Sequence, residues 1–335
     1  MLRLFSPVRL VVAGLLVAAA TFALWILPTE SYIFLPNEVH PVAPLVEVQG
    51  GKDPNDGGVY FVDVLVRKAT ILERLIPGLR EGATIVPVEQ VRPPGVSEEE
   101  RRREELEEMQ LSQRVAAAVA LRELGYKVVA TPIGARIEVV DPDAPASGKL
   151  VSGDLITSAG GKPVTGPAGL RRVIRGSGTG RPLLLVVKRG DKRVEVSIRP
   201  VRGPQGTPMI GVIISQAADI QLPIRVKIDT DNVGGPSAGL AFALDLLEEL
   251  GRDVDHGNRI AVTGALELDG TVGEVGGVKQ KTVGVERAGI KVFLVPAGDN
   301  AAEARRYADG IRIVPVTSFQ QALRSLATLP PARQD

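Results

Sequence analysis

Consecutive glycines precede a small hydroxyl in one stretch of the chain, a combination suited to acyl-transfer chemistry. In VKIDTDNVGGPSAGLAFALDLL, an extended run reaches Gly234, Gly235 and Pro236, and a helical apolar pattern begins at Ser237. An isolated serine at such a place is usually a helix cap. Here the glycines and the helix N-terminus turn backbone amides toward one point, which stabilises a developing oxyanion. We therefore predict a nucleophile at Ser237 and oxyanion donors on the backbone of Gly235, Pro236 and Ser237.

A base for this nucleophile must be found elsewhere, and a lysine is the obvious choice because the chain has only 2 histidines. Lys279 and Lys281 follow paired glycines in GGVKQKTVGVERAG, at the predicted start of a helix. A lysine serves as a base only if burial or neighbouring dipoles lower its pKa toward neutrality. A triad of Ser237, His256 and Asp255 is the alternative. It is disfavoured because adjacent Asp and His side chains do not easily adopt the required hydrogen bond.

Both motifs resemble those of the Lon-type serine/lysine proteases. GGPSAGLAFAL is similar to that family's serine motif, and VTGALELDGTVGEVGGVKQKTVGVERAGIKVFLVP to the segment that carries its lysine. The resemblance covers roughly residues 208–326. It implies that Ser237 is the nucleophile, that Lys281 is the general base, and that the Thr263 hydroxyl orients the lysine amine. The chain departs from the family at Gly234, where full-length Lon proteases usually carry an acidic side chain that neither catalytic role uses.

Composition limits the remaining possibilities. At 335 residues and 44% hydrophobic, the chain is long enough for two or three cores, and its net charge of +1 gives no reason to expect a nucleic-acid partner. The absence of cysteine removes disulfides and cysteine metal sites. No GxxxxGKS/T phosphate loop occurs in the chain. We expect no metal, no cofactor and no ATPase in cis.

An uncharged apolar run at 10–27 predicts a transmembrane helix. Arg3 and Arg9 precede it, so we predict a cytoplasmic segment at 1–9 and a retained anchor at 10–28. This places a single-pass protein in the cell membrane, with the lipid bilayer as a partner and the catalytic domain extracytoplasmic. A cleaved signal peptide is the alternative, disfavoured because the run is long and its small residues lie inside it.

Residues 126–202 read as strand, loop, short strand, Gly-Gly turn, helix and hairpin. Within them, PASGKLVSGDLITSAGGKPV resembles the PDZ family's pattern. The resemblance implies a PDZ-like β-barrel-type domain that binds a chain terminus or an extended segment by strand addition. By analogy the carboxylate-binding loop is 132–135, directly before a strand. The implied peptide-binding residues are Ile133, Gly134, Ala135 and Arg136.

With the remaining stretches included, the predicted fold class is α+β. Residues 29–125 hold extended strands and a charged helix that starts at a capping box of Ser97 and Glu100, and its charge run is explained by a solvated face. Which domain the strands join is not readable from the sequence. Residues 203–330 form the Lon-type proteolytic α/β domain. The predicted order is thus a transmembrane helix, this mixed segment, a PDZ-like domain and a proteolytic domain.

These observations predict an ATP-independent, membrane-anchored serine endopeptidase that cleaves unfolded or flexible protein segments. The PDZ domain would select protein or peptide substrates or regulate access to the site, and the family resemblance implies a homo-oligomer. A noncatalytic membrane PDZ adaptor with a degenerate protease domain is the alternative. The joint presence of Ser237, Lys281 and Thr263 argues against the adaptor.

Overall fold

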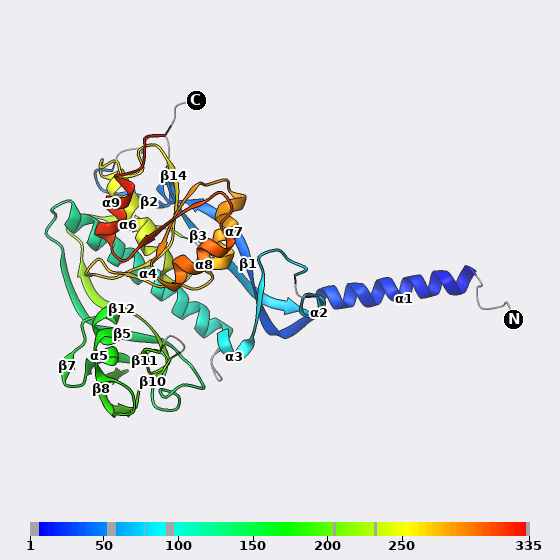
Figure 1. Ribbon diagram of the computed structural model, residues 1–335, viewed down its shortest axis with the longest axis horizontal. Helices are drawn as coiled ribbons and strands as arrows, with labels where there is room; N and C mark the ends of the chain where they lie inside the picture. Colours follow the sequence, from blue (N-terminus) through cyan, green and yellow to red (C-terminus); the bar gives the residue numbers. More distant parts are fainter. Residues whose placement is uncertain are drawn as a thin grey trace.

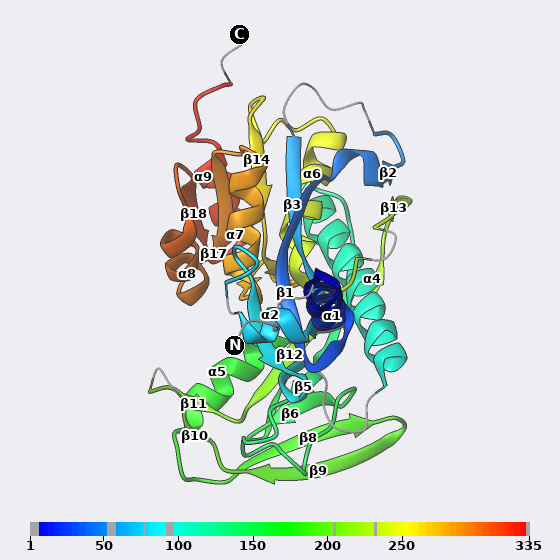
Figure 2. The same cartoon turned by 90° about the vertical axis from the view of Figure 1, so that its right-hand side faces the viewer.

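A large sheet with helices on both faces and a smaller sheet beside it make up the body of the molecule (Figures 1 and 2). The structure, a computed structural model, describes residues 7–332 apart from 52–57, 77, 92–96, 204–205 and 231–232. Helix α1 (Pro7–Ile26) projects away from this body in Figure 1. The mixed α/β character and the PDZ-like domain agree with the predicted fold class.

The predicted membrane anchor is wrong. Within the described ranges, no helix is both long enough and apolar enough to cross a bilayer. Helix α1 ends at Ile26, so it does not extend over the whole predicted anchor 10–28, whose last residue, Pro28, begins strand β1. The transmembrane element of the fold class is corrected accordingly. The single-pass localisation and the bilayer partner, which rested on that element, are corrected with it.

Six strands form the large sheet, and most of them come from the two ends of the sequence that flank the PDZ-like region. The three C-terminal strands are parallel, and a long N-terminal strand, β3, joins them in parallel at β14. Two further strands then pair antiparallel. Three strands at 28–41, 58–70 and 84–87, whose domain the sequence left unassigned, therefore complete this sheet. In spatial order the strands are β18 (Arg312–Val316), β17 (Val292–Pro296), β14 (Arg259–Val262), β3 (Gly58–Thr70), β1 (Pro28–Pro41) and β4 (Thr84–Pro87).

Helices cover both faces of the large sheet because its central strands are apolar on both sides. Ile260 and Val262 of β14 join the core on one face, whereas Ala261 between them joins the core on the other. The helix that follows Ser237 and the helix that carries Lys281 thus lie on opposite faces. The first core includes residues of α4 (Glu98–Glu123), α6 (Gly239–Glu249) and α9 (Phe319–Leu326), and the second includes residues of α7 (Val278–Arg287) and α8 (Asp299–Tyr307).

The smaller sheet has its own core and one helix, α5 (Pro167–Ser177). Its last strand in sequence, β12, returns to pair antiparallel with its first, β5. Strand β12 ends the sheet on that side, since β5 is its one partner among the described strands. In spatial order the strands are β12 (Val212–Gln221), β5 (Val129–Val140), β6 (Leu155–Ala159), β8 (Leu183–Arg189) and β9 (Lys192–Ile198), with β7 (Lys162–Pro163) beside β6.

Several short elements lie outside the two larger sheets. One short strand pair joins segments that are distant in sequence. Another closes a small hairpin near the site. The remaining elements are the 3₁₀ turns η1 (Ala43–Leu45) and η2 (Pro236–Ala238), helices α2 (Ile71–Leu75) and α3 (Val88–Val91), and the pairs β2 (Val46–Val48) with β13 (Val226–Ile228), β10 (Val201–Arg202) with β11 (Pro208–Met209), and β15 (Ala265–Leu266) with β16 (Val272–Gly273).

Candidate active site

Three polar side chains from three separate elements meet at one point. The Lys281 Nζ atom donates to Ser237 Oγ at 2.7 Å and to Thr263 Oγ1 at 2.9 Å. The Thr263 hydroxyl in turn lies 3.2 Å from the Ser237 carbonyl oxygen, to which it donates. These are ordinary hydrogen-bond distances. The arrangement gives a hydroxyl, an amine that contacts it, and a second hydroxyl that fixes the amine.

Local backbone geometry explains why these residues converge. Ser237 lies in the 3₁₀ turn η2, which Gly235 introduces with a φ of 85°, a value that favours glycine. Thr263 directly follows β14, and the next residue, Gly264, donates its N–H to the Ser237 carbonyl at 2.8 Å. Lys281 lies in the first turns of α7. The sheet, the serine turn and α7 therefore hold the three side chains close together.

Burial changes the chemistry of the lysine. Lys281 is 2% exposed, and Thr263 is fully buried. Removing the ammonium from water disfavours its charged form and lowers the pKa of Lys281 to about 8, although the Asp63 carboxylate acts in the opposite direction. A substantial neutral fraction near neutral pH is what a general base requires.

Asp63 on β3 is a residue of the site that the sequence analysis missed. Both of its carboxylate oxygens accept from Asn37 Nδ2, at 2.9 and 3.1 Å, and His40 Nε2 lies 3.4 Å away. These partners keep the carboxylate near Lys281 without a direct ion pair between them. A charged residue inside the apolar strand pattern VYFVDVLV was the available signal.

The hydroxyl and the amine open onto a cleft of about 960 Å³. One wall is the edge of β3 with Asp63, and the opposite wall is the N-terminal half of α4. This helix contacts the serine turn directly: Ser112 Oγ donates to the Pro236 carbonyl at 3.1 Å. The charge run of α4, interpreted above as a solvated face, thus borders the candidate site.

The predicted oxyanion donors are only in part available in this conformation. The Gly235 N–H donates to the Glu105 carbonyl of α4 at 2.9 Å. Pro236 has no N–H group. Of the three predicted positions, the Ser237 amide is therefore the one that could face an oxyanion without a rearrangement. A hydrogen bond from Gly235 would require the serine turn to separate from α4.

The predicted PDZ residues lie in a strand and not in a loop. Ile133, Gly134, Ala135 and Arg136 are inside β5, where β12 pairs along one side, and Ala135 and Arg136 also pair with β6 on the other. A Cβ atom at Gly134 would come within 2.5 Å of the Ile156 carbonyl oxygen, so glycine permits the close approach of these strands. An incoming peptide cannot add as a strand here, since both edges of this part of β5 are occupied.

The structure does not assemble the alternative triad. The His256 Nδ1 atom faces Asp253 at 3.5 Å, and the carboxylate of Asp255 accepts from the Gly257 N–H at 2.6 Å. The group that contacts Ser237 Oγ is Lys281. Lys279, two residues earlier, points elsewhere and donates to a backbone carbonyl.

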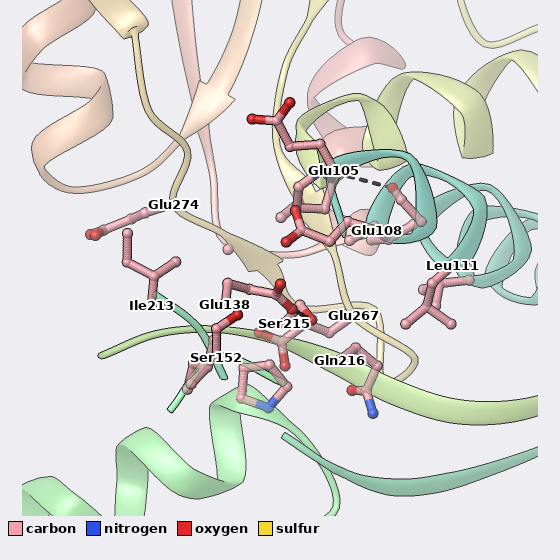
Figure 3. A pocket seen from close by; sticks show the side chains of 18 of the residues that line it. Glu105, Glu108, Leu111, Glu138, Ser152, Ile213, Ser215, Gln216, Glu267 and Glu274 are labelled. Atoms are coloured by element: carbon pink, nitrogen blue, oxygen red, sulfur yellow. Dashed lines mark hydrogen bonds between the residues drawn. The ribbon is translucent and has the colours of Figure 1, made fainter. Parts of the chain in front are cut away.

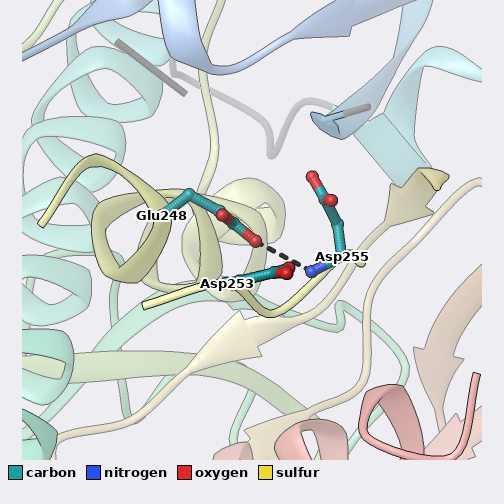
Figure 4. A group of neighbouring side chains, drawn as sticks. All are labelled: Glu248, Asp253 and Asp255. Atoms are coloured by element: carbon teal, nitrogen blue, oxygen red, sulfur yellow. Dashed lines mark hydrogen bonds between the residues drawn. The ribbon is translucent and has the colours of Figure 1, made fainter. Parts of the chain in front are cut away.

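An acidic group near the end of α6 has the spacing of metal ligands. The ligand atoms of Glu248, Asp253 and Asp255 all lie within 4.8 Å of one another (Figure 4). Glu248 Oε1 accepts from the backbone N–H groups of Val254 and Asp255, at 2.5 and 2.8 Å. Asp253 Oδ1 accepts from the His256 N–H at 2.7 Å. These bonds close the loop after α6 and explain why the carboxylates gather there.

Comparisons with known proteins agree with this geometry. Residues 216–328 match the model of the Lon protease C-terminal proteolytic domain, and residues 111–199 match that of the PDZ domain. The chain is 32% identical over 115 residues to Lon protease 2 of Bacillus subtilis, an alignment covering 34% of this chain and 20% of that protein. It is 49% identical over 70 residues to Lon protease 1 of Sorangium cellulosum, covering 21% of this chain and 8% of that protein.

Among solved structures, the PDZ domain of an SdrC-like protein from Listeria monocytogenes is 29% identical to this chain. The match covers 24% of this chain and 87% of the solved PDZ chain, with a TM-score of 0.24. The chain contains a Lon protease C-terminal proteolytic domain and a PDZ domain. It spans about a fifth or less of the length of the Lon proteases described here.

Proposed function

We propose that this chain is a serine endopeptidase in which Ser237 attacks the peptide carbonyl and Lys281 accepts the serine proton. Lys281 then returns that proton to the leaving amine, and water regenerates the serine by the same route. The observation that carries the proposal is the 2.7 Å contact between Lys281 Nζ and Ser237 Oγ, made by a lysine that is almost fully buried.

Thr263 acts as a positioning residue in this proposal. Its hydroxyl accepts from the Lys281 amine and donates to the Ser237 backbone, so it links the base to the turn that carries the nucleophile. A neutral amine has one lone pair, and that lone pair must face Ser237 Oγ to take the proton. The hydrogen bond to Thr263 favours that orientation.

The proposed substrates are unfolded or flexible polypeptide segments. The cleft admits an extended chain, and its walls come from the strand edge of β3 and the side of α4. A compact domain does not fit into a cleft of this size. We propose that cleavage does not require ATP, because the chain has no phosphate-loop motif that would couple hydrolysis to unfolding.

The PDZ domain selects substrate in this proposal, through the free edge of β12. This strand has one partner among the described strands, and a groove of about 610 Å³ runs between it and α5. A free strand edge with a neighbouring groove is what strand addition by a peptide requires. Arg175 of α5 lines the groove and provides a positive charge for a peptide carboxylate.

Hydrolysis of casein by the intact chain, with and without ATP, tests the proposal. We expect Ser237→Ala and Lys281→Ala each to lower the rate by more than about 10⁴-fold, since nucleophile and base act as a unit. Lys279→Ala is the matched control, because it removes a lysine from the same helix whose amine donates to the Ala83 carbonyl. Equal activity of wild type and Ser237→Ala contradicts the proposal, and an inactive wild type favours the adaptor.

A further inference from the structure

The peptide bond that joins Pro236 to Ser237 has a different space on each side. Pro236 lines a pocket of about 240 Å³ between the PDZ-like sheet and the proteolytic domain, and Ser237 lines the catalytic cleft. Figure 3 shows this pocket, with Glu105 and Leu111 of α4 on its wall. The peptide unit before the proposed nucleophile therefore stands at the boundary between the pocket and the cleft.

Ser112 of α4 holds the carbonyl side of this peptide unit. Its Oγ atom donates to the Pro236 carbonyl at 3.1 Å, and the residue is 5% exposed. Packing places this hydroxyl, because residues 115–121 in the following turns of α4 are buried. Gly239 makes room for it, since a Cβ atom there would lie 2.7 Å from Ser112 Oγ. The hydroxyl is thus fixed by the core that holds α4 against α6.

The amide side of the same unit points the other way. In a trans peptide the C=O and N–H bonds lie in one plane and point in opposite directions, and the described residues contain no cis peptide bond. The Ser237 N–H therefore points away from the Ser112 hydroxyl. A hydrogen bond that fixes the carbonyl also fixes the rotation of the plane, and so the direction of the N–H. It polarises the unit as well, which makes the N–H a stronger donor.

The peptide unit after Ser237 is fixed independently. The Ser237 carbonyl accepts from the Gly264 N–H at 2.8 Å and from the Thr263 hydroxyl at 3.2 Å. These two donors directly follow β14, whereas the Ser112 donor belongs to α4. They cannot replace Ser112, because the plane before Ser237 can rotate while the plane after it stays in place.

We propose that Ser112 is a positioning residue that holds the Ser237 N–H in the direction of the oxyanion formed during peptide hydrolysis. The inference rests on the proposed peptidase function and adds a residue to its site. When Ser237 Oγ bonds to the substrate carbonyl carbon, the serine proton passes to Lys281 and the π electrons of the carbonyl move to its oxygen. That oxygen becomes negative and is stabilised by the amide donor. Ser112 does not touch the substrate, so its loss should slow the reaction without weakening substrate binding.

Ser112→Ala tests this role in the steady-state hydrolysis of a peptide taken from a casein site that the wild type cleaves. We expect kcat to fall about tenfold and KM to stay within about twofold, because a misdirected donor weakens stabilisation of the transition state only. Ser112→Cys keeps nearly the same volume with a weaker donor, so it should lower kcat in the same direction without leaving a cavity. An unchanged kcat in both variants overturns the inference.

Gln113→Ala is the matched control. Gln113 is the next residue of α4, and its Nε2 atom donates to Thr230 Oγ1 at 3.1 Å. The substitution removes a hydrogen bond between α4 and the chain before the serine turn, and it leaves the contact with the Pro236 carbonyl intact. We expect kcat to stay within about twofold of wild type. A loss of kcat equal to that of Ser112→Ala would mean that a loosened α4 is the cause, which contradicts a role through the peptide plane.

A peptidyl trifluoromethyl ketone and the corresponding alcohol isolate the effect on the oxyanion. Ser237 Oγ adds to the ketone and gives a hemiketal oxyanion, whereas the alcohol binds without forming this adduct. We expect Ser112→Ala to raise the inhibition constant of the ketone about tenfold and to leave that of the alcohol unchanged. Equal changes for the two inhibitors overturn the inference, since general damage to the cleft weakens both.

The wild type separates this inference from the proposed function. If the wild type cleaves casein and Ser112→Ala matches it in kcat and in both inhibition constants, the positioning role fails and the peptidase function stands. If the wild type cleaves no casein, the peptidase function fails, and the positioning role that rests on it fails too.

Discussion

Lys281 and Asp245 are both ionisable groups buried in the same domain, and burial shifts the pKa of each in favour of its neutral form. Lys281 on α7 is 2% exposed, and its pKa falls to about 8. Asp245 on α6 is 1% exposed, and its pKa rises to about 8, because burial disfavours the carboxylate and the neighbouring Glu249 and Glu248 repel it. The two residues therefore have similar titration ranges and opposite charges.

Their surroundings differ in the feature that matters for chemistry. The Lys281 amine has two hydroxyl partners, one of which opens on the cleft. Asp245 Oδ2 has no hydrogen-bond partner among the described residues and faces no nucleophile there. A perturbed pKa marks burial in both cases. Lys281 is the candidate base, and Asp245 is not, because only Lys281 contacts a hydroxyl that opens on the cleft.

Replacement of Lys281 by methionine should separate activity from stability most strongly. We expect proteolysis to fall more than about 10⁴-fold, as for Lys281→Ala, because the base is lost. Stability at pH 7 should rise by about 1 to 3 kcal/mol, since the buried lysine no longer has to be charged or deprotonated at a cost. Chemical denaturation and casein hydrolysis measure the two effects. A Lys281→Met variant that is less stable than wild type would contradict the burial argument.

Thr263→Val removes the hydroxyl that holds the amine and keeps the side-chain shape. We expect kcat to fall by roughly 10- to 100-fold with little change in KM, because the base loses its orientation while substrate contacts remain. Thr263→Ser restores the hydroxyl and should recover most of the rate. If Val and Ser behave alike, packing and not the hydrogen bond determines the effect.

The pH dependence of proteolysis reports the lysine. Below the Lys281 pKa of about 8 the neutral amine is the minor form, so kcat/KM should rise about tenfold per pH unit and level off above pH 8. Stability follows the same group: its folded pKa lies below its unfolded pKa, so this contribution is present above the unfolded value and is lost as pH falls through about 8. A flat rate profile from pH 6 to 8 contradicts Lys281 as the base.

Asp245→Asn should change activity least. It touches none of the three candidate catalytic residues, so proteolysis should stay within about twofold of wild type. Because the folded pKa of Asp245 is raised, its contribution to stability is lost as pH rises toward about 8. Asn cannot ionise, so the variant should exceed wild type in stability at pH 9 by roughly 1 to 3 kcal/mol. Denaturation curves at pH 5 and pH 9 check this difference.

The candidate catalytic residues were predictable because their motifs are local. A Gly-Gly-Pro turn before Ser237 and paired glycines before Lys281 can be found within short windows of sequence. The approach of Asp63 to Lys281 was not predictable, because it depends on the parallel pairing of β3 with β14 across most of the chain. The free edge at β12 was missed for the same reason: residues 212–221 pair with a strand some eighty positions earlier.

The sequence by itself indicated Ser237, the pair Lys279 and Lys281, and the turns that present them, because backbone preferences of glycine and proline act over a few residues. The family resemblance then singled out Lys281 and Thr263. The sequence did not determine the burial of Lys281, the position of α4 beside the serine turn, or the pairing of β12 with β5. Those features depend on which distant elements pack together. Desolvation and charge proximity act through space, and only the tertiary structure fixes the distances on which they depend.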